Sequence, residues 1–253
     1  MPLDSVALEI PLAINLAAVF VGALVGTLRA GEEEHVDLVG MFTLAAAMGF
    51  GGGLVRDVLL GNLPPAAFRD PSYLITAAAA TLVAGVALVY LRRVERALWV
   101  LDSLAIGLFA CVGANAALIA GLQLLPAILI GTCASVGGLI LADMLQGRPS
   151  SIMYVGPPNA VAGFAGALVY SVFYSLDLAV LALVLAIVAT VAMRVTGRFF
   201  HWTIPQPRRR AYELRLRRAQ RPNDRPHRTT PTARRRARRL TRLQGSQSSD
   251  ESP

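Results

Sequence analysis

The sequence predicts an all-α membrane protein with seven transmembrane helices and a basic tail. Hydrophobic residues make up 55% of the 253 residues and charged residues only 16%, against about 45–50% and about 25% in ordinary globular proteins. The chain also contains seven mostly apolar runs, close to the ~20 residues that a helix needs to cross a bilayer. These two observations exclude an ordinary soluble domain.

The predicted spans are separated by short breaks of turn-forming or charged residues, which mark the ends of helices. The spans cover residues 11–29, 37–60, 72–91, 98–119, 124–146, 158–175 and 178–197. The breaks are the Glu-rich residues 31–35, the Pro-containing 62–71, the Arg-rich 92–96, then 121–123, 147–158 and a tight turn near Asp177. No cleavable signal peptide is expected, because residues 1–11 lack a basic region and the first apolar run is long enough to span.

The positions of the Arg residues predict the orientation, because basic loops remain on the cytoplasmic side. The chain has no Lys. With the N-terminus outside, the loop 92–96, Arg148 and the C-terminal tail all lie inside, and only Arg69 lies in an outside loop. The sequence therefore predicts a multi-pass protein of the cell inner (plasma) membrane, with its N-terminus outside and its C-terminus in the cytoplasm.

Residues 208–253 form a tail of different composition. They carry 15 Arg and four acidic residues, a net charge of +11, whereas residues 1–207 carry nine Arg and 12 acidic residues, a net charge of −3. The tail has too few apolar residues to offset the entropy lost on ordering, so we expect a disordered cytoplasmic segment. It is expected to fix the topology or to bind anionic membrane lipids. Nucleic acid is not an expected partner, because the chain shows no folded base-reading domain.

A run of Gly in the second span is the most informative motif. Gly51, Gly52 and Gly53 are followed within a turn by Arg56 and Asp57. Gly weakens a helix by about 1 kcal/mol relative to Ala, and a backbone group freed inside lipid must be satisfied by protein or by cavity water. The run therefore predicts a kinked or unwound segment that lines a cavity or packs against another backbone. Arg56 is the only Arg predicted well inside a span, and it should face the interior of the bundle.

A weaker copy of this motif lies 86 residues later, in the fifth span. Gly137, Gly138 and Asp143 correspond to two Gly and the Asp of the first motif, and Gly147 corresponds to Gly61. This predicts a membrane domain of residues 1–204 with two three-helix repeats, about 11–91 and 98–175, and an extra helix at about 178–197. Repeats with an odd number of spans enter the membrane in opposite senses, so the two are inverted. Interrupted helices at matching places of inverted repeats indicate a permeation or substrate site.

Three further polar residues lie in the predicted spans. Asn15 in the first span matches Asp102 in the fourth at an offset of 87 residues, and Asn115 lies further along the fourth. Each is a candidate pore-lining residue, but Asp102 would serve equally as a helix cap one turn inside its span, and the two Asn as interhelical hydrogen-bond partners. Counting Arg56 against the three Asp of the spans gives a net charge of −2, which favours cations.

Enzyme chemistry is not expected. The two Cys, Cys111 and Cys133, lie in apolar stretches without the spacing of a metal site. The Gly run lies within an apolar span and lacks the strand–turn–helix context of a nucleotide-binding loop. The sequence therefore predicts no metal, no cofactor and no catalytic residue.

Taken together, these motifs resemble the prokaryotic trimeric intracellular cation channel (TRIC) family. The similarity covers about residues 11–204 and rests on the GGG-x-x-RD-x-x-x-G element, the Arg69-Asp70-Pro71 that opens the third span, the second GG copy and the three-plus-three-plus-one layout. It implies a homotrimer in which each subunit holds its own pore, bordered by the kinked second and fifth helices, and conducts monovalent cations such as potassium. Carried over by position, the kinks are Gly51, Gly52 and Gly53 with Arg56 and Asp57, and Gly137 and Gly138 with Asp143.

The second motif departs from the family pattern, which expects a third Gly and an Arg where the chain has Leu139 and Ala142. We therefore expect a weaker bend and a lost positive charge in the second half. An alternative is a secondary transporter of a small zwitterion such as glycine, in which Arg56 and helix amides hold the carboxylate and an Asp the ammonium. A third is a lipid-organising protein that acts through its tail. Saturable, substrate-specific flux would distinguish a transporter from a channel.

Overall fold

The protein is all-helical in the residues that the computed structural model describes, which are 12–33, 35–90, 94–152 and 158–200. The helices are α1 (Leu12–Ala30), α2 (Leu38–Leu59), α3 (Ala66–Arg69), α4 (Pro71–Tyr90), α5 (Val94–Ile119), α6 (Leu124–Leu145), α7 (Asn159–Tyr174) and α8 (Ala179–Phe199). The predicted tail at 208–253 lies outside the described residues.

All seven predicted spans are confirmed as helices, and α3 is an additional short helix in the loop after the second span. The largest boundary difference is the start of α5, at Val94 instead of residue 98. Among the described residues, six helices are long and apolar enough to cross a membrane. The seventh, α7, is shorter at 16 residues, because it starts after Pro158 and ends before the turn at Asp177, whose φ is 60°.

Helix α4 begins where the Arg-Asp-Pro sequence predicts. Pro71 is its first residue, a position at which the missing N–H of Pro is not needed for helical hydrogen bonds. The Asp70 carboxylate accepts a hydrogen bond from the backbone N–H of Ser72 at 2.9 Å, as a capping residue does. This hydrogen bond holds the pKa of the Asp70 carboxyl below its usual value.

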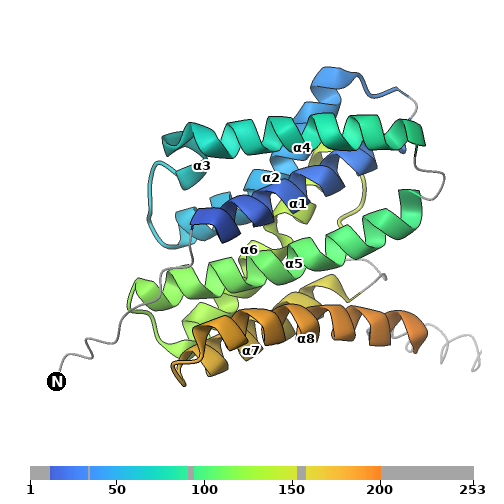
Figure 1. Ribbon diagram of the computed structural model, residues 1–253. Coiled ribbons are helices and arrows are strands. Elements are labelled where there is room, and N and C mark those ends of the chain that lie inside the picture. The colour runs from blue at the N-terminus through green and yellow to red at the C-terminus, as the bar shows by residue number, and fades with distance from the viewer. Residues whose placement is uncertain (1–11, 34, 91–93, 153–157, 201–253) are drawn as a thin grey trace, which may run out of the picture. The chain divides into compact units, whose positions relative to one another are not determined.

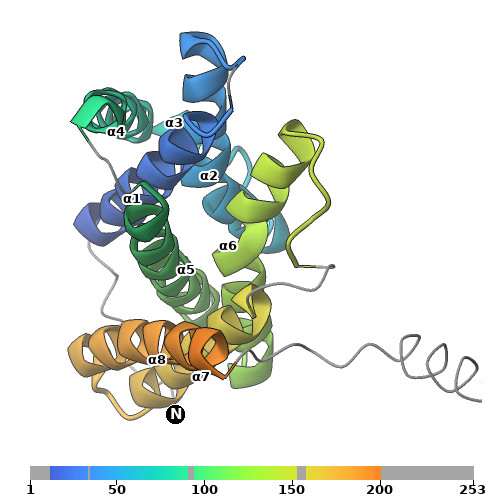
Figure 2. The ribbon, with the colours of Figure 1, turned by 90° about the vertical axis from the view of Figure 1, so that its right-hand side faces the viewer.

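Four helices form a closed ring of contacts: α1 packs on α2, α2 on α6, α6 on α5, and α5 on α1. Helix α4 covers α1 and α2, while α7 covers α5 and α6, and α8 packs on α7 and α5. In Figure 1, α4, α1, α5 and α8 run side by side, and α2 and α6 cross behind them. Figure 2, turned by 90°, shows α2 and α6 together on one side of α1 and α5.

The Gly run of α2 lies within a continuous helix, so the predicted unwinding is wrong. Helix α2 is α-helical from Leu38 to Leu59, and its Gly residues serve contact with α6. A Cβ atom added to Gly51 would lie 2.6 Å from the Cα of Gly138, and one added to Gly52 would lie 2.5 Å from the carbonyl oxygen of Ala134. Small residues allow helix backbones to approach closely. Gly53 differs from its neighbours, because nothing lies within 4 Å of its Cβ position.

Helices α2 and α6 end in the same local structure. The residues after them, Leu60 and Gln146, have φ and ψ of −86° and −5°, and −80° and −3°. The next residues, Gly61 and Gly147, have positive φ of 71° and 62°, a conformation that Gly adopts without steric cost. Gly61 and Gly147 therefore share one backbone conformation, which Gly121 after α5 also adopts, with a φ of 79°.

Candidate functional site

One group of buried and half-buried polar side chains lies where α2 ends beside the start of α1. This Asp57 cluster consists of Asn15, Arg56 and Asp57. The Nε atom of Arg56 donates to Oδ1 of Asp57 at 2.8 Å, and its Nη2 atom lies 2.7 Å from the same oxygen. The Nη1 atom of Arg56 donates to Oδ1 of Asn15 at 3.2 Å. Arg56 is 8% exposed, so its charge is enclosed by the bundle, as predicted.

Arg56 and Asp57, which are neighbours at the end of α2, pair with each other. The long side chain of Arg56 reaches the adjacent carboxylate at the last turn of α2, where no following turn stands in its way. The other carboxylate oxygen, Oδ2, accepts a hydrogen bond from the backbone N–H of Ala66 at 2.8 Å. Asp57 thereby holds both the guanidinium and the loop that leads to α3.

A second group lies near the other end of α1. This Asp143 cluster consists of Arg29, Asp102, Asp143 and Arg194, from α1, α5, α6 and α8. Nη1 of Arg194 donates to Oδ2 of Asp102 at 2.7 Å. Arg29 lies between the two carboxylates, 3.4 Å from Asp143 Oδ1 and 3.9 Å from Asp102 Oδ1. Oδ2 of Asp143 accepts hydrogen bonds from the backbone N–H of Ser151 at 2.8 Å and from its hydroxyl at 2.9 Å.

The structure corrects two predictions about this cluster. Asp102 is not a helix cap, because α5 begins at Val94, two turns earlier, and Asp102 is only 4% exposed. Arg56 is not the only Arg inside the bundle, because Arg194 is 3% exposed and is bound to Asp102. Arg194 lies near the end of the last predicted span, at 178–197, where an Arg is typical of the cytoplasmic boundary. In the structure, α8 continues for more than a turn beyond Arg194, to Phe199, so Arg194 lies inside the helix and not at its end.

The charges of the two clusters balance. Arg29, Arg56 and Arg194 face Asp57, Asp102 and Asp143, so the six groups carry no net charge when all are ionised. The net charge of −2 expected from the sequence is therefore wrong, because it omitted the Arg residues at the ends of α1 and α8. The expected loss of positive charge beside Asp143 is wrong as well, since Arg29 supplies it.

The remaining predicted polar residue lies away from both clusters. Asn115 of α5 accepts a hydrogen bond at 2.9 Å from the hydroxyl of Tyr170 of α7, and both residues are buried. It therefore has the interhelical role that the sequence left open. Gly137 and Gly138 of α6 contact α2, at Gly51 and Met48 respectively, which makes them packing residues of the α2–α6 contact.

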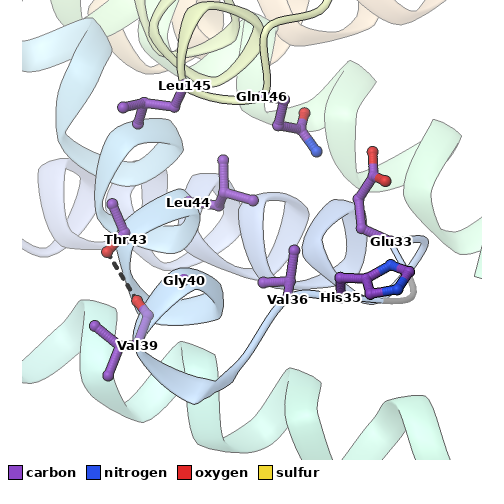
Figure 3. Close-up of a pocket in the computed structure, with 9 residues that line it drawn as sticks. All are labelled: Glu33, His35, Val36, Val39, Gly40, Thr43, Leu44, Leu145 and Gln146. Atoms are coloured by element: carbon purple, nitrogen blue, oxygen red, sulfur yellow. Dashed lines mark hydrogen bonds between the residues drawn. The ribbon is translucent and has the colours of Figure 1, made fainter.

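A cavity of about 450 Å³ lies beside the Asp143 cluster, at the loop between α1 and α2 and the end of α6. Its polar lining includes Glu33, His35 and Gln146, while Leu44 and Leu145 contribute apolar walls. Figure 3 shows the Glu33 carboxylate and the Gln146 amide on the same side of the cavity. Glu33 also pairs with Arg148. This cavity was not predictable from the sequence, because its walls come from distant segments. In the part of the chain that the structure describes, no cluster of potential metal ligands is present.

The fold and the site define a multi-pass helical membrane protein with a neutralised cluster of buried charges at each end of its first helix. Comparison with known proteins gives the particular family. The chain belongs to the family described as Glycine transporter, which matches residues 12–90 and 99–175, and its similarity to the prokaryotic TRIC family is confirmed by solved structures.

Curated relatives are bacterial membrane proteins. The chain is 37% identical over 141 residues to a UPF0126 membrane protein of Deinococcus radiodurans, covering 56% of this chain and 65% of the relative. It is 44% identical over 92 residues to UPF0126 membrane protein SCO4104 of Streptomyces coelicolor, covering 36% and 42%. It is 28% identical over 196 residues to UPF0126 inner membrane protein YadS of Escherichia coli K12, covering 76% and 93%. The first two alignments thus span less than two thirds of the relatives.

Solved structures match nearly their whole length. A structure described as the basis for conductance through TRIC cation channels has a TM-score of 0.68 and 25% identity, and the match covers 78% of this chain and 97% of that one. A TRIC trimeric intracellular cation channel orthologue from Rhodobacter sphaeroides has a TM-score of 0.69 and 25% identity, with coverage of 76% and 98%. The chain therefore has the TRIC fold.

Proposed function

We propose that the protein is a potassium-permeable channel for monovalent cations, with one pore in each subunit of a homotrimer. The observation that carries this proposal is the match over 97–98% of the length of two TRIC cation channel structures at 25% identity. A pore within each subunit is supported by the presence of both charge clusters in a single chain. The proposed site comprises these clusters and the Gly residues of α2 and α6.

The proposed path runs between two inverted repeats. Three observations support the repeat: the family matches the chain twice, α2 and α6 have the same C-terminal hydrogen bonds, and equivalent Gly residues make equivalent contacts. Gly26 of α1 lies against Leu44 of α2, and Gly113 of α5 lies against Gly131 of α6. Bends at the Gly residues of α2 and α6 are part of the proposal, since a bend would open the α2–α6 contact.

The proposal includes the orientation of the protein in the membrane. With the N-terminus outside, the Asp57 cluster faces the outer solution and the Asp143 cluster faces the cytoplasm. The Arg-rich tail at 208–253 then lies at the cytoplasmic surface, where its net charge of +11 favours contact with anionic lipids. The relative YadS, described as an inner membrane protein, supports the plasma membrane as the location.

A second function, secondary transport of glycine, is favoured by two specific observations. The matching family is described as Glycine transporter, and the buried charges are balanced between guanidinium and carboxylate groups. Balanced clusters suit a zwitterion, because a guanidinium binds its carboxylate and an Asp binds its ammonium. A charge-balanced site gives less preference for cations than the sequence had indicated.

Purified protein in liposomes distinguishes the two functions. We expect potassium flux that rises without saturation as the potassium gradient is increased, together with single-channel steps in planar bilayers. Protein-free liposomes provide the control. Saturable glycine uptake without potassium current would contradict the channel and establish the transporter.

The oligomeric state is a separate expectation. Because each subunit carries both clusters, assembly does not have to build the pore, and the lipid-facing surfaces of the helices are free to form the interface. We expect light scattering in detergent to give three times the subunit mass of 26.9 kDa. A stable monomer or dimer that still conducts potassium would contradict the trimer.

A further inference from the structure

We propose that Arg29 of α1 takes the place of the arginine that α6 lacks, and that it closes the ion path at the Asp143 cluster. This inference rests on the proposed function and deepens it by naming the residue that controls one mouth. The position preceding Asp143 holds Ala142, which is completely buried in an apolar cluster that includes Val25 and Leu44. The guanidinium beside Asp143 comes from α1 instead.

Asp57 and Asp143 occupy equivalent places in their helices. The backbone oxygen of Asp57 accepts a hydrogen bond from the N–H five residues later at 2.8 Å, and that of Asp143 does the same at 3.0 Å. In each case, Oδ2 accepts a backbone N–H from the following loop, from Ala66 and from Ser151, both at 2.8 Å. In each case, Oδ1 faces a guanidinium. The helix that supplies the guanidinium differs, and Asp143 accepts one further hydrogen bond, from the Ser151 hydroxyl.

The third member of each cluster matches as well. The guanidinium of Arg56 reaches Asn15 at 3.2 Å, and that of Arg29 reaches Asp102 at 3.9 Å. Asn15 and Asp102 are the residues that the 87-residue offset pairs between the first and fourth spans. The exchange of Asn for Asp adds a negative charge at the second cluster, and Arg194 of α8 neutralises it at 2.7 Å.

Because the guanidinium comes from a different helix in each cluster, separating the helices breaks different contacts at the two ends. Arg56 and Asp57 belong to one helix, so separation of α1 from α2 leaves their ion pair intact and breaks only the neutral contact with Asn15. Arg29 instead joins α1 to α6 and α5 by charge, so these helices cannot separate without breaking ionic contacts. The Asp143 end is therefore the end whose opening depends on ion pairs.

Arg29 is also the most easily displaced of the three guanidinium groups. Its contacts of 3.4 and 3.9 Å are longer than the 2.7 Å contacts of the other two. Its side chain is 14% exposed, against 10% for Arg56 and 3% for Arg194. A charge that is loosely held and partly wet can be exchanged for a mobile cation at lower cost than a dry, tightly bonded one. Arg29 thus acts as a tethered cation at the carboxylate of Asp143.

Stability measurements test the replacement. Arg29→Ala should lower the melting temperature of the full-length protein in detergent, because the buried Asp143 loses its positive partner. Arg29→Ala combined with Ala142→Arg should recover most of that loss, because it returns a guanidinium from the other helix. The matched control combines Arg29→Ala with Ala142→Gln, which adds a long polar side chain without charge. Equal stability of these two double variants would overturn the inference.

A further variant covers the case in which a long side chain at position 142 prevents folding. Arg29→Ala combined with Asp143→Asn removes the unbalanced charge without adding volume, so it should melt at a higher temperature than Arg29→Ala alone. A double variant that is less stable than Arg29→Ala would show that Arg29 does not neutralise the Asp143 carboxylate, and would overturn the inference.

Current recordings in planar bilayers test the closure. We expect Arg29→Ala to increase potassium current, more strongly for ions that enter from the Asp143 side, so that the current rectifies. Arg29→Lys keeps the positive charge and should therefore raise the current less than Arg29→Ala does. An unchanged or symmetrical current in Arg29→Ala would overturn the closure. If the proposed function fails, the unmodified protein carries no potassium current. The melting temperatures of the Arg29 variants then still test whether Arg29 is the positive partner of Asp143.

Discussion

Substitution of Arg194 by Ala will lower the free energy of unfolding by about 3–5 kcal/mol, the loss typical of removing one partner from a buried ion pair. Arg194 is 3% exposed and donates to Asp102 at 2.7 Å. Without it, the buried carboxylate of Asp102 retains only the 3.9 Å contact with Arg29. Denaturant or thermal unfolding in detergent, followed by circular dichroism, measures the difference.

A double variant separates the charge from the packing. Asp102→Asn combined with Arg194→Met removes both charges and should recover most of the lost stability, because an apolar replacement of a buried pair is often neutral. Arg198→Ala is the matched control. Arg198 is exposed and lies over the same Trp99 ring, at 5.4 Å compared with 5.9 Å for Arg194, so its loss should cost less than about 1 kcal/mol. Similar losses for the two single variants would contradict a buried ion pair at Arg194.

The second large effect is expected at Gly52, where a methyl group has no space. Its Cβ would lie 2.5 Å from the carbonyl oxygen of Ala134 and 2.8 Å from Cδ1 of Phe109. Because the first of these is a backbone atom, α2 and α6 must move apart. Gly52→Ala should therefore destabilise the protein by about 1–3 kcal/mol, the usual cost of overpacking a core, as measured by the same unfolding assay.

The adjacent residue provides the control. Nothing lies within 4 Å of the Cβ position of Gly53, so Gly53→Ala should be neutral or should stabilise α2 by up to about 1 kcal/mol through helix propensity. The same variant tests the proposed bend. If the Gly run must flex for conduction, Gly53→Ala will be stable but will pass less potassium current. Equal destabilisation by the two substitutions would contradict the assignment of Gly52 to the α2–α6 contact.

The lengths of the apolar runs were sufficient to predict the seven spans, because the bilayer imposes one length on every crossing segment. The Arg-Asp-Pro start of α4 was predictable for a local reason as well, since Asp70 and Pro71 act on neighbouring backbone groups. The predicted start of α5, at residue 98, was four residues too late, because the Arg-rich residues 92–96 suggested an interfacial loop. The same error made Asp102 look like a helix cap.

The site was only partly predictable, because ion pairing between distant residues leaves no pattern in one sequence. Arg29 and Asp143 are 114 residues apart, and Arg194 and Asp102 are 92 residues apart. Arg near a span end fixes topology in most membrane proteins, and the sequence does not reveal which of these Arg residues turn inward. Asp57 and Asp143 were found because the repeat placed them in register. The Arg residues that neutralise the second cluster have no counterpart in that register.

The bond between α8 and α5 has a consequence for biogenesis. Asp102 is synthesised 92 residues before Arg194, and ribosomes add about 5–20 residues per second, so roughly 5–20 seconds separate the two. During that interval Asp102 has been synthesised and its closest counter-ion has not. Among the helices that the structure describes, the last to be made is therefore the one that neutralises Asp102. A nascent chain that terminates before α8 would carry two carboxylates at this cluster, Asp102 and Asp143, against the single guanidinium of Arg29, so one acid would enter the bilayer in excess.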